Sequence, residues 1–171
     1  MRSAYGAKES EICHHQAIPT RGGLGGSSPR ARIVVDVANV MGSRPDGWWR
    51  DRPGAAVRLH AELASLASKG RPVLPGDTGP GDTGPDDAGP EEFVMVLEGA
   101  TKAAAPRIEN NSPVRVVKAD GSGDDAIVAL VRELSGRRVV VTADRELRRR
   151  CEAAGAEVFG PSWLIGLVRG Q

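Results

Sequence analysis

The segment Ile33-Val34-Val35-Asp36-Val37-Ala38-Asn39-Val40 decides how this chain folds. Three β-branched residues precede an acid, and an amide side chain follows three positions later. A continuous apolar run of this length is typical of a buried strand in a parallel sheet that is covered on both faces. Asp36 therefore falls at the carboxyl end of the strand, the edge where ligands bind in an open α/β sheet. A carboxylate is costly to bury there unless charge or hydrogen bonds compensate it.

Strands and helices alternate along the rest of the chain. We predict buried strands at residues 93–99, 114–118, 138–144 and 157–159, and helices at residues 52–69, 124–134, 145–154 and 162–168. A polar loop is predicted over residues 42–53, with Asp51 as the cap of the next helix and Pro53 in its first turn. This alternation predicts an α/β fold, a three-layer α/β/α sandwich with a central, mainly parallel sheet.

The 171 residues are expected to form one domain over residues 31–171. Residues 1–30 lack apolar periodicity and are interpreted as a disordered tail. Residues 75–91, in which Gly-Asp-Thr-Gly-Pro repeats with a period of five, are interpreted as a disordered acidic insertion. The formal net charge of +1 neither favours nor excludes a polyanionic partner.

We expect a cytoplasmic protein. The two cysteines, Cys13 and Cys151, have no metal-ligand spacing and are typical of a reducing compartment. No apolar run is long enough to span a bilayer, and the first 20 residues lack the hydrophobic centre of a secretion signal.

Acidic residues recur at one position relative to the predicted strands. Asp36, Glu98 and Asp144 end three strands, and Asp124 with Asp125 opens the helix after another. Right-handed crossovers bring the carboxyl ends of these strands to one edge of the sheet, so the acids should converge within a few ångströms. Such carboxylates cannot all stay ionised unaided, and an all-oxygen site suits Mg²⁺ or Mn²⁺. The predicted metal ligands are Asp36, Glu98, Asp124 and Asp144.

Each acid also has a simpler explanation. Asp124 or Asp144 could cap a helix, Asp36 could accept hydrogen bonds from loop amides, and Glu98 could be a solvated strand end. Their coincidence at one edge of the sheet favours a shared site.

Four segments carry these acids in order along the chain. They are Asp36-Val37-Ala38-Asn39, Leu97-Glu98-Gly99, Gly123-Asp124-Asp125-Ala126-Ile127 and Val141-Thr142-Ala143-Asp144. Together they resemble the acidic motifs of PIN-like nucleases, most closely the YacP-like members of the NYN branch. The resemblance covers about residues 31–165 apart from the insertion.

This resemblance implies a metal-dependent ribonuclease in which Asp36, Asp124 and Asp144 hold metal or water. Asn39 matches the polar residue that steadies the first acid. Glu98 stands where that branch often has aspartate, and the match leaves open which of Asp124 and Asp125 faces the metal.

The implied reaction is metal-assisted hydrolysis of a phosphodiester bond without a covalent nucleophile. Two alternatives stay open: hydrolysis of a pyrophosphate bond in free nucleotides on the same metal site, and a catalytically silent RNA-binding module. RNA is the expected partner. A homodimer is left open beside a monomer.

Basic and aromatic side chains after Asp36 are candidates for substrate contact. Positive charge beside aromatic rings is a combination used to bind single-stranded nucleic acid. The alternative is that one or both tryptophans pack beneath the next helix while the arginines are solvated. Arg145 belongs to a basic cluster with the arginines at 148–150, either a phosphate track or a solvated helix face. The loop candidates are Arg44, Trp48, Arg50 and Arg52, beside Trp49.

Overall fold

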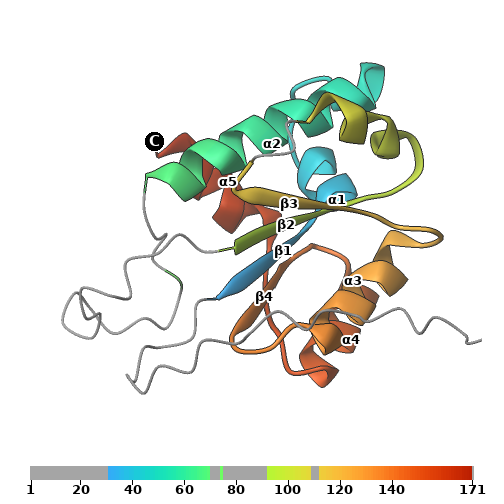
Figure 1. Cartoon of the computed structure of the whole chain (residues 1–171), viewed down its shortest axis with the longest axis vertical. Coiled ribbons are helices and arrows are strands. Elements are labelled where there is room, and N and C mark those ends of the chain that lie inside the picture. The colour runs from blue at the N-terminus through green and yellow to red at the C-terminus, as the bar shows by residue number, and fades with distance from the viewer. Residues whose placement is uncertain (1–30, 70–73, 75–91, 109–111, 171) are drawn as a thin grey trace, which may run out of the picture.

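The computed structural model describes residues 31–69, 74, 92–108 and 112–170. Within them, five parallel strands form one sheet in the order β3-β2-β1-β4-β5 (Figure 1). The strands are β1 (Arg32–Asp36), β2 (Glu92–Leu97), β3 (Val114–Lys118), β4 (Arg138–Val141) and β5 (Glu157–Phe159). The helices are α1 (Val37–Gly42), α2 (Arg52–Ser68), α3 (Gly123–Glu133), α4 (Arg145–Ala153) and α5 (Pro161–Arg169), with 3₁₀ helices η1 (Trp48–Arg50) and η3 (Gly99–Arg107).

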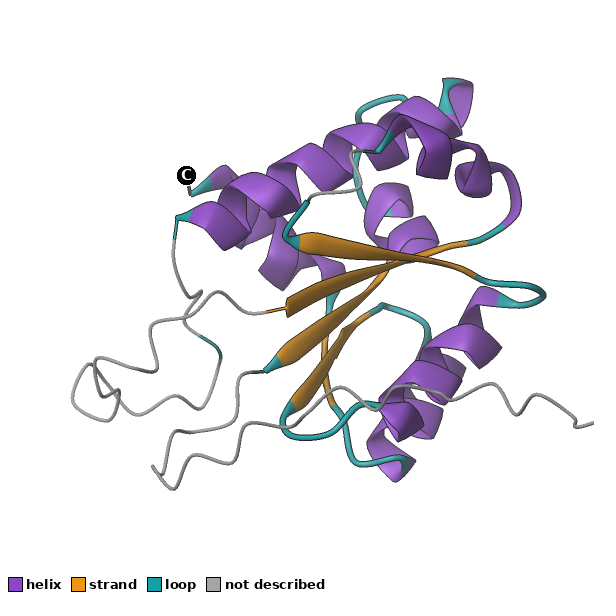
Figure 2. Ribbon diagram, in the orientation of Figure 1, coloured by secondary structure: helices purple, strands orange, loops and turns teal. Residues whose placement is uncertain are grey.

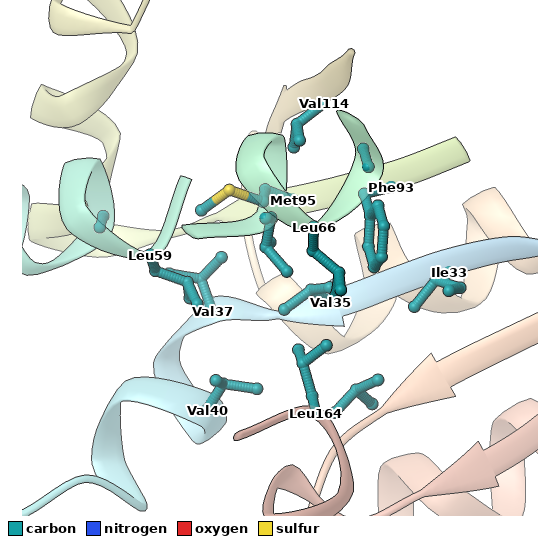
Figure 3. Close-up of a cluster of buried hydrophobic side chains, with 14 of the residues drawn as sticks. Ile33, Val35, Val37, Val40, Leu59, Leu66, Phe93, Met95, Val114 and Leu164 are labelled. Atoms are coloured by element: carbon teal, nitrogen blue, oxygen red, sulfur yellow. The ribbon is translucent and has the colours of Figure 1, made fainter. Parts of the chain in front are cut away.

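Helices cover both faces of the sheet, which confirms the predicted α/β/α sandwich (Figure 2). Alternate side chains of each strand enter the two cores. In β1, Ile33 and Val35 pack with Phe93 and with α1, α2 and α5, while Val34 faces α3 and α4. Figure 3 shows the first of these cores. Each such side chain contributes roughly 1.5–3 kcal/mol through its burial, so β1 is the anchor of the fold.

The order of the strands reverses beside β1. From β1 the chain moves to β2 and β3 on one side of the sheet, then crosses to β4 and β5 on the other side. Because all the strands are parallel, their carboxyl ends meet at one edge. In an open α/β sheet the crevice between the strands at such a reversal is where ligands bind. Here that crevice lies between the ends of β1 and β4.

The predicted strands and helices are all present, with ends that differ by a few residues. The sequence did not predict α1, η1 or η3, and η1 lies inside the segment predicted as a loop. α1 forms because Asp36 caps it by accepting a hydrogen bond from Asn39 N. Val37, Val40 and Met41 then lie at helical spacing and are buried.

The start of α2 is confirmed, since Asp51 accepts a hydrogen bond from Gly54 N at 2.9 Å and Pro53 lies in the first turn. The predicted tail at residues 1–30 and the predicted insertion at residues 75–91 lie outside the described residues. No helix in the described ranges is both long enough and apolar enough to cross a membrane.

Candidate active site

Asp36, the last residue of β1, is the most buried of the candidate acids, with 7% of its surface exposed. Its Oδ1 accepts a hydrogen bond from Asn39 N at 3.1 Å, and its Oδ2 accepts one from the Thr142 hydroxyl at 2.9 Å. Burial raises the pKa of Asp36, these hydrogen bonds lower it in part, and the charge of Glu98 raises it further. The two hydrogen bonds therefore hold the Asp36 carboxylate in one orientation, while its burial removes water from the charged group.

Thr142 and Asn39 join the end of β1 to the segment after β4. The fully buried Thr142 donates to Asp36, and its Oγ1 also accepts a hydrogen bond from Asp144 N at 3.1 Å. The Asn39 side chain accepts a hydrogen bond from Ala143 N at 3.2 Å. These contacts are consistent with the steadying role that the family resemblance gives Asn39. Thr142 had no predicted role. The sequence feature that could have indicated this role is a hydroxyl at the end of a buried strand, two positions before an acid.

Asp144 caps α4 and also faces the crevice. Its Oδ1 accepts a hydrogen bond from Leu147 N at 2.7 Å, so the helix-cap explanation considered for this residue is confirmed. Its Oδ2 makes no hydrogen bond within the described part of the chain. The cap thus uses one oxygen and leaves the second available to a ligand.

The first turn of α3 presents Asp124 to the site and turns Asp125 away. Burial raises the pKa of Asp124, and the charges of Asp36, Asp144 and Glu98 raise it further. The Asp125 side chain is 71% exposed and forms an ion pair with Arg150 of α4. Successive helical side chains point about 100° apart, so one of the two must face elsewhere. Of these two predicted catalytic acids, Asp124 is thus the one coupled to Asp36, Asp144 and Glu98, and Asp125 is paired with Arg150.

Glu98 directly follows β2 and reaches the same turn of α3. Its Oε2 accepts a hydrogen bond from Gly123 N at 2.8 Å. Its backbone N–H donates to the Thr101 hydroxyl at 2.9 Å, which fixes the start of η3. Glu98 is therefore a half-buried, hydrogen-bonded residue, unlike the solvated strand end considered as its alternative.

The candidate acids form an electrostatically coupled group and not a closed metal cage. Among the described residues, no three His, Cys, Asp or Glu side chains are grouped so as to hold a metal ion. The expectation of four or five carboxylates within a few ångströms of one another is thus corrected. In the same residues, no cationic side chain forms an ion pair with Asp36, Glu98 or Asp144.

The chemistry of the donors nevertheless fits a hard cation. All the donors are carboxylate oxygens, which suit Mg²⁺ or Mn²⁺. Mg²⁺ commonly keeps several waters and binds through only one or two protein carboxylates together with substrate phosphate. A hydrated divalent cation needs no preassembled cage, and Asp36, Asp124 and Asp144 can supply its protein oxygens.

Arg44 does not contact this site. Its side chain is 11% exposed, and its Nη1 lies 2.6 Å from Oε2 of Glu62 in α2. The side chain predicted to bind substrate thus forms an ion pair that ties the segment after α1 to α2.

Two tryptophans in η1 have different surroundings. Trp48 packs against the core, and the Arg52 guanidinium lies 5.3 Å from its ring centroid. Trp49 is 57% exposed and meets Trp48 edge to face, with centroids 6.3 Å apart. Packing beneath the helix thus holds for Trp48 alone, and Trp49 with Arg50 stays on the surface.

The basic cluster on α4 is mostly paired. Arg148 forms an ion pair with Glu152, Arg149 with Glu146, and Arg150 with Asp125. The exposed Arg145 forms no ion pair with any described residue. The solvated-face explanation therefore fits residues 148–150, while Arg145 stays a candidate contact beside Asp144.

This arrangement defines the class of the protein: a parallel α/β sandwich with acids at the strand-order reversal. No family model matches the chain, and no curated protein matches it by sequence. Among solved structures, the fold is similar to a crystal structure of a point mutant of Rae1 (YacP) from Bacillus subtilis, with a TM-score of 0.57 and 15% sequence identity. The match covers 82% of this chain and 76% of that one. At this identity the similarity concerns the fold alone.

Proposed function

We propose that this protein is a metal-dependent ribonuclease that hydrolyses phosphodiester bonds of RNA. The observation that carries the proposal is the electrostatic coupling of Asp36, Asp124 and Asp144. They come from three separate segments at the edge where the strand order reverses, and the charges of Asp36 and Asp144 act on Asp124. Carboxylates that repel one another are costly for a fold, above all the buried Asp36, so their presence at a ligand-binding edge favours a cation as their partner.

Asp36, Asp124 and Asp144 would hold Mg²⁺ or Mn²⁺. When bound, such a cation supplies stabilisation of the negative charge that develops on the phosphate. The chain's own residues orient the site: Thr142 and Asn39 fix Asp36, and Thr142 also fixes the backbone of Asp144.

Single-stranded RNA fits the exposed surface formed by Trp49, Arg50 and Arg52. Trp49 and Arg50 lie in η1, between α1 and α2, and Arg52 is the first residue of α2. An exposed indole offers a face for stacking a base, and exposed guanidinium groups bind phosphate. Arg145, next to Asp144, is a second candidate for phosphate contact.

The test uses labelled single-stranded RNA and an equimolar mixture of nucleoside triphosphates, each incubated with Mn²⁺, with Mg²⁺ or with a chelator. The wild type is expected to cut the RNA only when the metal is present. Asp36→Asn and Asp124→Asn should abolish cutting. Asp125→Asn is the matched control, because it removes the same charge one residue along, where the side chain faces Arg150.

Other outcomes would assign another function. Cleavage of the triphosphates with intact RNA would identify a nucleotide pyrophosphohydrolase on the same acids. RNA that is bound but never cut with either metal would identify a silent binding module. Equal loss in Asp124→Asn and Asp125→Asn would refute the assignment of Asp124.

A further inference from the structure

Glu98 differs from the other candidate acids in what its carboxylate contacts. Asp36 and Asp144 accept hydrogen bonds from the helices that directly follow them in the chain. Glu98 forms a capping box with Thr101 at the start of η3, and in addition it accepts a hydrogen bond from Gly123, 25 residues away, the first residue of α3. It therefore links the end of β2 to the start of α3.

The first turn of α3 has no side-chain cap of its own. Ser122 occupies the cap position, but its side chain makes no capping hydrogen bond. The first N–H groups of a helix have no partner within the helix, and a carboxylate is favourable there because of the helix dipole. Glu98 supplies what Ser122 does not, through a hydrogen bond of 2.8 Å to Gly123 N.

The absence of a side chain at position 123 makes this contact possible. A Cβ built on the buried Gly123 would lie 2.6 Å from Glu98 Oε2 and 2.8 Å from its carboxyl carbon. Such distances are shorter than a nonbonded contact allows, so the carboxylate occupies the space that any other residue would need. Gly123 and Glu98 are thus complementary in shape as well as hydrogen-bonded.

Asp124 directly follows Gly123. The direction of its side chain, toward the other acids or away from them, depends on the residue at which α3 begins. A shift of one residue in the helix start would rotate Asp124 by about 100° and exchange it with Asp125. We propose that Glu98 is a positioning residue and not a metal ligand: it clamps Gly123 and so keeps Asp124 directed at Asp36. This inference rests on the proposed function at one point, the assumption that Asp124 takes part in the reaction.

The first experiment measures exchange of the Gly123 amide proton in the metal-free protein. Glu98→Gln keeps an acceptor oxygen at the same reach and should keep the amide protected. Glu98→Ala should accelerate exchange at least about fivefold, the equivalent of one ordinary hydrogen bond. Equal exchange in Glu98→Ala and the wild type would overturn the clamp.

The second experiment measures Mn²⁺ affinity by calorimetry. A positioning role predicts that Glu98→Gln binds Mn²⁺ nearly as well as the wild type. Glu98→Ala should bind about 10- to 100-fold more weakly, as for other outer-shell residues. Asp124→Asn is the comparison for a lost ligand charge. If Glu98→Gln is as weak as Glu98→Ala, the carboxylate charge itself is needed and the positioning role is refuted.

A third measurement uses the steric complementarity. Gly123→Ala should have a more favourable effect on the melting temperature in the Glu98→Ala background than in the wild type, because its Cβ then meets no carboxylate. The same shift in both backgrounds would contradict the proposed contact.

These results separate the two proposals. A protein that binds no Mn²⁺ and cuts no RNA would refute the ribonuclease, and amide exchange would still decide the clamp. A protein that cuts RNA while Glu98→Ala leaves the Gly123 amide protected would refute the clamp alone.

Discussion

Replacing Thr142 with valine tests whether the crevice is built around a charged Asp36. Valine has the same shape but lacks the hydroxyl that donates to Asp36 Oδ2 at 2.9 Å and accepts from Asp144 N at 3.1 Å. Thr142 has no exposed surface, so water does not replace the lost donor. A hydrogen bond to a charged group contributes about 1.5–3 kcal/mol. We expect a loss of this size at pH 7, or roughly 3–12 °C in melting temperature.

The loss should depend on pH in a defined direction. The Thr142 hydroxyl lowers the pKa of Asp36, so its removal raises that pKa further. The penalty of Thr142→Val is therefore largest where Asp36 is ionised. Once acid protonates Asp36 in the wild type, the penalty should shrink toward that of a neutral hydrogen bond, about 0.5–1.5 kcal/mol. Urea unfolding of the metal-free proteins across pH measures this.

Thr142→Ser is the matched control, because it keeps the hydroxyl and loses only a methyl group. Its cost of about 1 kcal/mol should not change with pH. A Thr142→Val protein that is as stable as the wild type at pH 7, or whose penalty is the same at every pH, would refute the reasoning.

The remaining predictions concern charge, stacking and reactivity. Burial raises the pKa of Asp36 above 3.8, so in the native state this carboxyl keeps its proton over a pH range in which the unfolded chain has lost it. The free energy of unfolding of the metal-free protein should therefore fall as pH rises through that range. Asp36→Asn should reduce this pH-dependent fall and should be no less stable than the wild type at pH 7. Trp49→Ala should leave the melting temperature unchanged and weaken binding of single-stranded RNA, measured by fluorescence anisotropy, by about 1–3 kcal/mol. Arg52→Ala should reduce the salt dependence of that binding, and an unchanged slope would remove Arg52 from the interface. Burial raises the pKa of Cys151 to about 11, so a thiol reagent at pH 8 should modify it only after unfolding.

The frame of this fold could be predicted from the sequence because its signals are local. A run such as 33–35 has no polar interruption. A parallel topology places Asp36 and Asp144 at one edge of the sheet, so this placement can be predicted without information on contacts between distant residues. α1 was missed because a helix of six residues is too short to show a periodic pattern.

Details of the site depend on partners that are distant in sequence. The Thr142 hydroxyl bonds to a residue 106 positions away, and nothing near it in the sequence indicates that partner. Arg44 is a basic residue in the loop after Asp36, and nothing near it in the sequence indicates its ion pair with Glu62, 18 positions away. The choice between Asp124 and Asp125 depends on the residue at which α3 begins, and the structure ties that point to Glu98.

The double role of Asp36 and Asp144 determines which substitutions can test the site. Each uses one oxygen to cap the helix that follows it, so alanine would remove a cap worth about 1 kcal/mol together with the charge. Loss of activity in an alanine variant would therefore not separate a missing cation-binding oxygen from a displaced helix. Asparagine caps as well as aspartate and removes the negative charge. At Asp36 it also replaces the oxygen that accepts from Thr142 by an NH2 group, so the Thr142→Val protein is the comparison for that lost hydrogen bond. If the acids serve a cation, the asparagine variants should keep α1 and α4 and lose metal binding; if they serve only as caps, the same variants should behave as the wild type in every assay.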